Sequence, residues 1–441
     1  MNCKVCKFGG SSLADAGQFK KVADIINAEE ERRYVVASAP GKRDKNDIKV
    51  TDLLYDCYDK AANGEDFDEV LAKIKLRYDN IIKDLGLVDF ELDEDFDKIK
   101  ASFSNMAGRD YAASRGEYLN SKILAAYLGY DFIDAAKVIF FDDHGKYDWE
   151  KTREKLRPLL EATPKAVIPG FYGSMPNGTI RTFSRGGSDV TGSIVARAAR
   201  ATLYENWTDV SGFLIADPRV VKNSQPIKTI TYTELRELAY MGASVLHEDA
   251  IFPVRSAGIP INIRNTNRPQ DPGTTILSET AEPCEHIITG IAGKRGMSVI
   301  NIEKDKMNSE IGFGRNVLRS LEKNDVSFEH IPSGIDTMSV VIQTDALTGK
   351  ETAILDEIHS RVHPDQLYIE SDLALITIVG RGMKSARGTA AILFTALAEA
   401  RVNVKMIDQG SSELNIIIGV AEEDFDIAMR AIYDAFIKIE R

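Results

Sequence analysis

The sequence predicts an α/β protein in two parts, an α/β sandwich around a mostly parallel sheet followed by two small ferredoxin-like units. Residues 1 to about 283 alternate short apolar strands with longer helical patterns, which is typical of a parallel sheet covered by helices. Beyond that point the chain repeats itself. At 441 residues it is also too long for one ordinary core, so two or three domains are expected.

Five short apolar segments of the first part read as strands, with helical patterns between them. In chain order these segments are VCKFGG, YVVASAP, VIFF, AVIPGFYG and PINIRN. Residues from about 60 to 115 are nearly all helical in pattern and highly charged. This stretch therefore predicts a helical insertion rather than a part of the sheet.

The second part contains an internal repeat. When the chain is shifted by 76 residues, Ile300 falls on Ile376, and the register holds without a gap from about 299 to 344. Glycines at 312 and 388 open the first helix of each copy, the strands VSFEHI and VNVKMI are expected next, and further helical stretches lie near 348–361 and 422–437. The order strand, helix, strand, strand, helix predicts a ferredoxin-like unit that is present twice.

The composition excludes several classes of protein. A net charge of −12 argues against a general binder of nucleic acid or anionic membranes, so any anion site must be a local cluster of cations. No apolar run approaches a membrane span and no apolar segment follows the first basic residue, which predicts a cytoplasmic protein. Cys3 and Cys6 would face opposite sides of one strand, and no second pair completes a metal site, so the cysteines are expected to be structural thiols.

The stretch KFGGSS, Lys7 to Ser12, has the residue types of a phosphate site. Glycines let backbone amides approach a ligand closely, hydroxyls donate hydrogen bonds, and lysine supplies a point charge. The spacing is neither that of a Walker loop nor that of a dinucleotide-binding loop. Taken alone, the stretch could equally be an ordinary glycine-rich turn after an edge strand.

Five further stretches decide between these interpretations. They are VVASAPGKRDKNDIKVTDLL, SRGEYLNSKILAAYLG, FSRGGSDVTGSIVARAA, NWTDVSGFLIADPRVV and ELAYMGASVLHEDAIFPV. With KFGGSS, and in this order over essentially the full length, they resemble the aspartokinases of the amino-acid kinase family. Each stretch is a weak signal by itself, whereas the combination is highly specific.

This resemblance implies the three-layer α/β/α sandwich of the amino-acid kinases over residues 1–283, with the helical insertion at about 60–115. Two ferredoxin-like (βαββαβ) ACT units are implied at 284–370 and 371–441, and their halves can be intertwined. The resemblance is to monofunctional forms, because there is no room for an appended homoserine dehydrogenase. ACT units usually pair between subunits, which implies a homodimer or a dimer of dimers.

The implied reaction transfers the γ-phosphoryl group of ATP, bound with Mg²⁺, to the β-carboxylate of L-aspartate. Its product, 4-phospho-L-aspartate, begins the route to lysine, threonine and methionine. Catalysis of such a transfer consists mostly of positioning and charge neutralisation. Two alternatives are a kinase of glutamate or of an acylated amino acid, and a catalytically silent amino-acid sensor.

The residues suggest how the two substrates would be held. Lys7 is expected on the migrating phosphoryl group, with the amides of the following glycines beside it, and Asp189 resembles the family's aspartate that holds this lysine. The alternative for Asp189 is a helix N-cap. Glu117 is the natural partner for the ammonium group of the substrate, and Arg185 for its α-carboxylate. The resemblance also implies that Ser38 and Thr51 contact aspartate through their hydroxyl groups.

The nucleotide is expected to lie along KFGG and two later stretches. Two positions depart from a common family pattern, because Ser244 replaces a nucleotide-contacting lysine and Leu214 stands where some members carry a tyrosine. Arg219 of DPR resembles a phosphate contact. The residues expected to contact the nucleotide are Lys7, Phe8, Gly9, Gly10, Thr208, Asp209, Leu214, Arg219 and Ser244.

An inhibitory amino acid is expected at the loop before the first helix of an ACT unit, where free amides and the helix dipole attract a carboxylate. These loops are MNSEIGFG in the first copy and MKSARGTA in the second. Glu329 corresponds to Lys405, so a cationic effector such as lysine would be drawn to the first copy, unless both are simply solvated strand positions. The residues expected to contact the effector are Met307, Asn308, Ser309, Gly312, Phe313 and Glu329.

Overall fold

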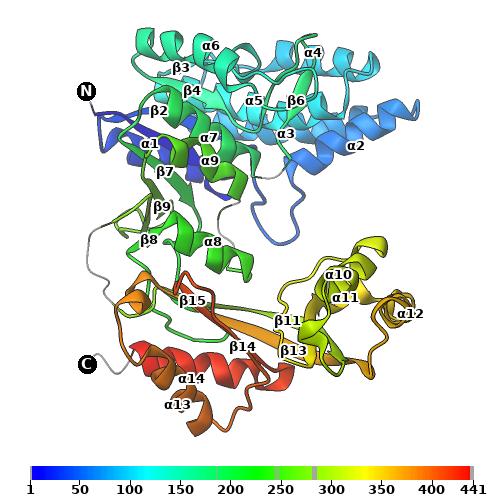
Figure 1. The fold of residues 1–441 in the computed structure, drawn as a ribbon. Coiled ribbons are helices and arrows are strands. Elements are labelled where there is room, and N and C mark those ends of the chain that lie inside the picture. Colours follow the sequence, from blue (N-terminus) through cyan, green and yellow to red (C-terminus); the bar gives the residue numbers. More distant parts are fainter. Residues whose placement is uncertain (1, 185, 244–245, 247, 281–285, 438–441) are drawn as a thin grey trace. The chain divides into compact units, whose positions relative to one another are not determined.

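The computed structural model describes the chain except residues 1, 185, 244–245, 247, 281–285 and 438–441. The chain forms two compact units, each made of several segments (Figure 1). The first unit consists of Met1–Phe213, Pro226–Tyr232 and Val245–Thr280. The second consists of Leu214–Gln225, Thr233–Ser244 and Ala281–Arg441.

The first unit contains an eight-stranded, mostly parallel sheet in the order β3-β4-β2-β1-β7-β9-β10-β8 (Figure 1). The strand β10 runs antiparallel to its neighbour β9, and β8 pairs parallel to β10, so these two strands at one end of the sheet run opposite to the others. The strands are β1 (Lys4–Phe8), β2 (Arg32–Ala37), β3 (Asp131–Phe132), β4 (Ala166–Pro169), β7 (Leu203–Thr208), β8 (Thr229–Thr231), β9 (Ile261–Asn265) and β10 (Thr274–Leu277), with a separate hairpin of β5 (Tyr172–Ser174) and β6 (Ile180–Thr182).

Helices cover both faces of this sheet. Cys6, Phe8 and Trp207 lie in one buried cluster with residues of α1 to α5, whereas α7 covers the opposite face, to which Lys7 points. The helices are α1 (Ala16–Asn27), α2 (Val50–Ala62), α3 (Asp68–Leu85), α4 (Asp93–Ser104), α5 (Arg109–Leu128), α6 (Trp149–Ala162), α7 (Gly187–Ala198) and α9 (Glu248–Ser256). The predicted α/β sandwich is confirmed.

The predicted strands differ from the observed ones in three ways. VIFF forms only isolated bridges at Phe140 and Phe141, because the Ile139 amide bonds back to Ala135 in a turn; this prediction is wrong. AVIPGFYG splits into β4 and β5. The short strands β3, β6, β8 and β10 were not among the predicted strands, and neither was the central strand β7, which lies between β1 and β9.

A buried ion pair ties the strands together on the face of α1. Glu205 of β7 is 1% exposed and accepts from Arg32 Nε at 2.8 Å, from Trp207 Nε1 at 3.0 Å and from Cys6 Sγ at 3.3 Å. Burial and the neighbouring Glu205 raise the pKa of the Cys6 thiol well above its usual range, so Cys6 is an inert structural thiol.

We expect Glu205→Ala to lower the free energy of unfolding by roughly 3 kcal/mol, because it removes the buried ion-pair partner of the Arg32 guanidinium and leaves the guanidinium the half-buried Glu29. Urea unfolding measures this change. The control is Lys73→Ala, which breaks a solvent-exposed pair with Glu69 and should change little. Equal effects of the two substitutions would contradict the expectation.

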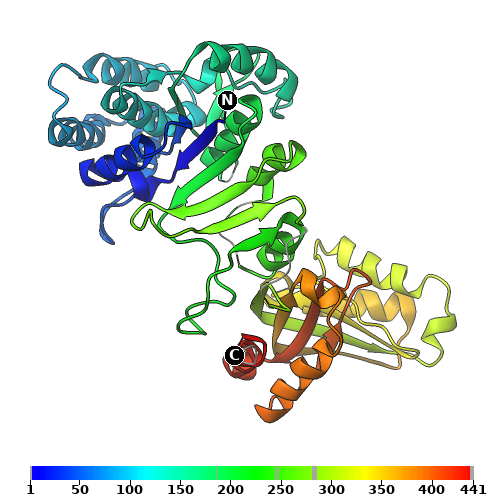
Figure 2. The same cartoon turned by 90° about the vertical axis from the view of Figure 1, so that its left-hand side faces the viewer.

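The second unit contains a five-stranded antiparallel sheet in the order β12-β11-β13-β15-β14 (Figure 2). The two long strands β11 and β13 pair along most of their length, so both repeats share one sheet. Its strands are β11 (Gly290–Glu303), β12 (Thr337–Gln343), β13 (Gln366–Val379), β14 (Met406–Asp408) and β15 (Asn415–Ala421). Its helices are α8 (Tyr232–Tyr240), α10 (Phe313–Lys323), α11 (Thr344–Leu347), α12 (Glu351–Val362), α13 (Thr389–Glu399) and α14 (Phe425–Ile437).

The repeat predicts the helix starts of this unit correctly. Gly312 and Gly388 precede α10 and α13 with φ of 85° and 86°, a conformation that favours glycine. The strand expected at VSFEHI is wrong, because this segment forms only an isolated bridge, at His330, whereas VNVKMI contributes to β14.

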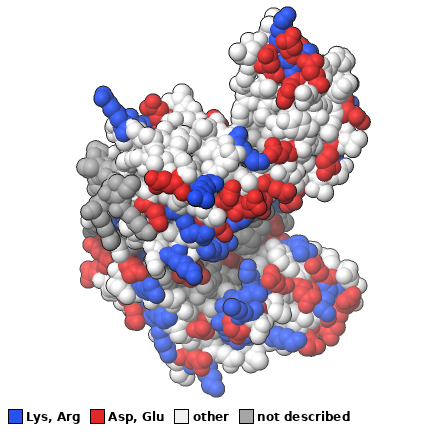
Figure 3. Space-filling model, turned by 90° about the horizontal axis from the view of Figure 1, so that it is seen from below, with Lys and Arg blue, Asp and Glu red and all other residues white. Residues whose placement is uncertain are grey.

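On the face shown in Figure 3, acidic and basic side chains are interspersed rather than gathered into one basic field. Of the helices that the structure describes, none is long and apolar enough to cross a membrane.

Candidate active site

Lys7 and Asp189 form an ion pair over the centre of the parallel sheet. Lys7 lies on β1, is 7% exposed, and its Nζ is 2.6 Å from Asp189 Oδ1. Asp189 lies in the first turn of α7, whose N-cap is Gly186. Asp189 is therefore not the N-cap, and its carboxylate is directed at the lysine instead. Asn206 of β7 donates to the same Oδ1 at 2.8 Å.

Glu117 of α5 is a second buried charge-bearing group of this unit. It is 6% exposed, and its Oε2 has no hydrogen-bond partner among the residues that the structure describes. Burial raises the pKa of Glu117 to about 8, although the Ala39 amide, Arg115 and Lys7 act in the opposite direction. A buried carboxyl oxygen without a partner is costly unless a ligand satisfies it. Glu117 is therefore suited to receive a cationic group.

The main chain around Glu117 packs closely against the end of β2. A Cβ on Gly116 would lie 2.8 Å from that of Ala39, so α5 can approach this closely only with glycine there. Asn120 of α5 donates to the carbonyl of Ser38 at 2.8 Å. The predicted substrate residues Ser38 and Thr51 are both half-buried, the first just after β2 and the second in the first turn of α2.

The glycines after Lys7 have different surroundings from those predicted. The Gly9 amide donates to the Trp207 carbonyl at 3.0 Å, so in this structure it does not face a ligand. A Cβ on Gly10 would meet the Ala39 carbonyl at 2.9 Å, which requires glycine where the two loops meet. The Phe8 side chain is fully buried against Trp207 and could reach a ligand only through its main chain.

The remaining nucleotide candidates fall in three places. Thr208 ends β7 and its hydroxyl donates to Asp209, whose side chain is exposed. Leu214 and Arg219 belong to the second unit, where Arg219 is held by Asp217 at 3.0 Å. Two predicted contacts, Arg185 and Ser244, lie outside the described residues.

The candidate effector residues of the first ACT copy are partly structural. Met307 and Phe313 are buried in the core of this copy, whereas Asn308 and Ser309 are exposed. Glu329 is 3.3 Å from Lys294. Its charge is therefore already neutralised within the unit.

The same pair occurs with reversed charges in the second copy. A shift of 76 residues takes Lys294 to Glu370 and Glu329 to Lys405, and these two side chains also form an ion pair. Each copy therefore has one positive and one negative side chain at these two positions, in opposite order. This difference between the copies does not by itself leave a free negative charge in the first copy.

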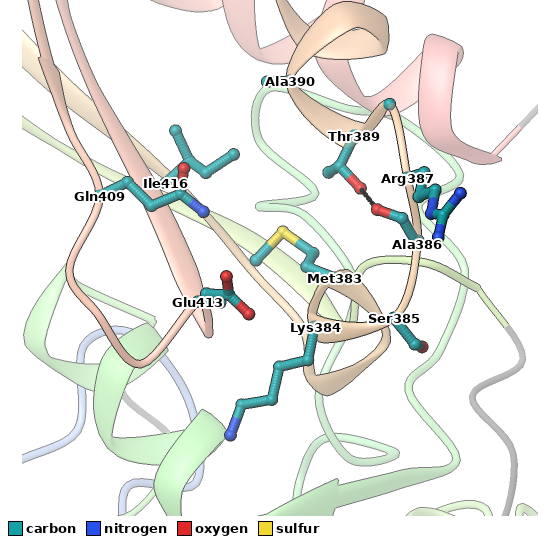
Figure 4. A pocket seen from close by; sticks show the side chains of 11 residues that line it. Met383, Lys384, Ser385, Ala386, Arg387, Thr389, Ala390, Gln409, Glu413 and Ile416 are labelled. Carbon is teal, nitrogen blue, oxygen red and sulfur yellow. Dashed lines mark hydrogen bonds between the residues drawn. The ribbon is translucent and has the colours of Figure 1, made fainter.

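A cavity of about 470 Å³ lies at the loop before α13 in the second copy (Figure 4). Lys384 and Arg387 line it together with Glu413, so residues of both charges surround a space of amino-acid size. The helix start at Gly388 adds backbone amides. This cavity lies in the second copy, whereas the sequence analysis expected a cationic effector in the first.

Two residues beside Asp189 were missed by the sequence analysis. Asn206 and Tyr204 lie on β7 and both bond to Asp189. The available signal was a pair of polar residues, Glu205 and Asn206, between two aromatic residues in the stretch LYENWT. Within the described part of the chain, no three His, Cys, Asp or Glu side chains are grouped to hold a metal.

Comparison with known proteins assigns the family. The amino acid kinase family matches residues 2–265, and the ACT domain matches residues 376–436. Aspartokinase 3 of Bacillus subtilis (strain 168) is 38% identical over 449 residues, which cover 98% of each chain. The chain belongs to the aspartokinases of the amino acid kinase family. Aspartate phosphorylation and allosteric regulation through ACT domains follow from this membership.

Solved structures of aspartokinases agree over the whole length. The chain is 54% identical to the aspartate kinase of Clostridium acetobutylicum, with a TM-score of 0.93 over 99% of this chain and 100% of that one. It is 26% identical to E. coli aspartokinase III in complex with lysine and aspartate, called the T-state, with a TM-score of 0.76 over 99% of both chains. The same E. coli enzyme in complex with aspartate and ADP, the R-state, has a TM-score of 0.72 at 25% identity over 98% of this chain and 99% of that one.

Proposed function

We propose that this aspartokinase transfers the γ-phosphoryl group of ATP to the β-carboxylate of L-aspartate with Lys7, Asp189 and Glu117 in direct roles. The observation that carries the proposal is the buried Lys7–Asp189 pair at 2.6 Å in the same unit as the partnerless Glu117 oxygen. The Lys7–Asp189 pair would supply a fixed cation, and Glu117 would supply a site for an ammonium group. The complex of the E. coli relative with aspartate and ADP supports aspartate and an adenine nucleotide as the two ligands.

The attacking group needs no general base. The β-carboxylate of aspartate is already ionised at neutral pH and is itself the nucleophile. The new bond joins a carboxylate oxygen to the γ-phosphorus while the bond to the β,γ-bridging oxygen breaks, and ADP leaves with those electrons. Negative charge is spread over the three equatorial oxygens during the transfer. Lys7 would neutralise that charge, and Asp189 would keep its Nζ in place.

Binding of aspartate would use its remaining groups. Its ammonium would bind Glu117, its α-carboxylate would bind Arg185, and Ser38 and Thr51 would add hydroxyl contacts. An N-acylated amino acid has no ammonium and would leave Glu117 unsatisfied, which disfavours that alternative. A silent sensor would have no use for the Lys7–Asp189 pair.

We propose that Thr208, Asp209 and the loop at Gly10 contact the nucleotide, with Leu214 and Arg219 as further candidates. Mg²⁺ would enter with the nucleotide. The phosphate oxygens of the nucleotide, together with water, would supply most of the Mg²⁺ ligands, because the described residues offer no preformed cluster. Mg²⁺ commonly binds in this way. The bound ion would offset the charge of the polyphosphate.

The test is an assay with ATP, Mg²⁺ and hydroxylamine, which traps acyl phosphates as hydroxamates. L-aspartate should yield hydroxamate and ADP in equal amounts. Glutamate and N-acetyl-aspartate are the matched alternatives, and both should yield much less. Preference for either of them, or binding of aspartate without any turnover, would contradict the proposal.

We further propose that the regulatory units span about 284–370 and 371–441, join subunits as a homodimer or dimer of dimers, and bind lysine as inhibitor. The lysine complex of the E. coli relative supports this effector. The first-copy loop remains the proposed site, with the effector's ammonium competing with Lys294 for Glu329. The cavity at the second-copy loop favours a second candidate site.

We expect Glu329→Ala to raise the lysine concentration for half-inhibition at least tenfold if the first copy binds the effector. The matched substitution in the second copy, Lys405→Ala, should have little effect. Arg387→Ala, in the cavity of the second copy, separates the two sites. Loss of inhibition in Arg387→Ala with normal inhibition in Glu329→Ala would place the effector in the second copy and contradict the first assignment.

A further inference from the structure

The strand β7 presents a row of side chains to the N-terminal part of α7. Tyr204 and Asn206 lie on the same face because they are two residues apart on the strand. Lys7 of β1 is the register partner of Asn206, so Lys7 and Asn206 lie side by side on that face. Glu205 and Trp207 belong to the opposite face, where they contact each other.

These two residues hold Asp189 at two separate points. Asn206 Nδ2 donates to the carboxylate Oδ1 at 2.8 Å, and the Tyr204 hydroxyl donates to the main-chain carbonyl of Asp189 at 3.1 Å. Tyr204 is fully buried and Asn206 is 4% exposed. The ring of Tyr204 also leaves no room for a Cβ on Gly192, so α7 is packed tightly against it.

We propose that Asn206, assisted by Tyr204, is a positioning residue for phosphoryl transfer that acts through Asp189 on Lys7. This inference rests on the proposed role of Lys7. The lysine stem is flexible, and the direction of its Nζ depends on where its carboxylate partner lies. A carboxylate bound by Lys7 alone can rotate about its terminal bond, whereas the Asn206 amide fixes Oδ1 from a rigid central strand. Small displacements of a positioned group are costly to catalysis.

The test substitution is Asn206→Leu, which keeps the approximate volume and removes the donor. We expect kcat to fall about ten- to a hundredfold, while the KM for aspartate stays within twofold, because Glu117 and Ser38 are unaffected. The control is Asn262→Leu on the adjacent strand β9, where a buried amide donates to Pro272 and Thr275 instead. That variant should lose stability but keep its kcat.

A double substitution shows whether Asn206 acts through Asp189. In an Asp189→Asn background, Asn206→Leu should cause little further loss of kcat, since groups that act as a unit are not additive. A normal kcat in Asn206→Leu, or a full additional loss in the Asp189→Asn background, would overturn the inference. If Asn206→Leu does not fold, Tyr204→Phe replaces it, with a kcat at least threefold below that of the wild type as the supporting result and an unchanged kcat as the contrary one.

Failure of this inference differs from failure of the proposed function. Lys7→Met reports on the function alone. An inactive Lys7→Met with a fully active Asn206→Leu would overturn only the positioning role. An active Lys7→Met would overturn the catalytic assignment itself.

Discussion

Replacing Lys7 with methionine should lower kcat for aspartate phosphorylation by about 10³-fold or more. Methionine matches the length of most of the lysine stem but carries no charge to offset the equatorial oxygens of the migrating group, and such cations are worth orders of magnitude in phosphoryl transfer. The KM for aspartate should change little, because its proposed contacts are Glu117, Arg185 and hydroxyls. Release of ADP and formation of hydroxamate measure the loss.

Two further variants make this result specific. Lys4→Met removes another cation of the same strand, at the start of β1, where Lys4 pairs with Glu29. The kcat of this variant should be that of the wild type. Lys7→Met combined with Asp189→Asn removes both charges of the pair, so neither is left unpaired. It should be about as inactive as Lys7→Met alone, because the pair acts as one unit. An active double variant would show that the loss came from an unpaired Asp189 carboxylate and not from the missing cation.

The sequence was informative where function depends on residues close together in the chain. KFGG placed Lys7 at a strand end, and the resemblance paired it with Asp189, which the structure brings to 2.6 Å. The glycines at 312 and 388 indicated the helix starts, because a positive φ there favours glycine. Such local constraints can be inferred directly from the residue types.

The sequence was uninformative where a side chain acts through a partner on another strand. Nothing in LYENWT shows that Asn206 meets Asp189, because that contact depends on which strands are neighbours. Likewise, Glu329 and Lys405 suggested a charge difference between the copies. The sequence alone did not show that Lys294 and Glu370 compensate each of them. VIFF was misassigned because apolar composition does not show whether a neighbouring strand is present.

Glu117→Gln should raise the KM for aspartate roughly 10- to 150-fold, with a smaller change in kcat. A hydrogen bond to a charged group contributes about 1.5–3 kcal/mol, and the amide keeps the shape of the carboxyl without its charge. The control is Asp95→Asn. Asp95 is a buried carboxyl of α4, within the helical insertion, and it pairs with Lys122 of α5. That variant should keep the wild-type KM. A wild-type KM in Glu117→Gln would remove Glu117 from the substrate site.

The pH dependence gives an independent test of the same residue. Burial raises the pKa of Glu117 from 4.5 to about 8, so at pH 7 the free enzyme mostly holds the proton. The ammonium of aspartate favours the carboxylate, and binding would release that proton. The wild-type KM should therefore fall as pH rises from about 6 to 8, whereas the KM of Glu117→Gln should not.

The free energy of unfolding should also depend on pH through the proton bound to Glu117. A folded-state pKa above the unfolded value contributes stability that is complete below about 4.5 and is lost as pH rises through about 8. Glu117→Gln carries no such proton, so its free energy of unfolding relative to the wild type should increase between pH 5 and pH 8. Urea unfolding at several pH values measures this difference. A difference that does not change with pH would mean that Glu117 is not held in its protonated form, and the expected fall of the KM with rising pH would fail with it.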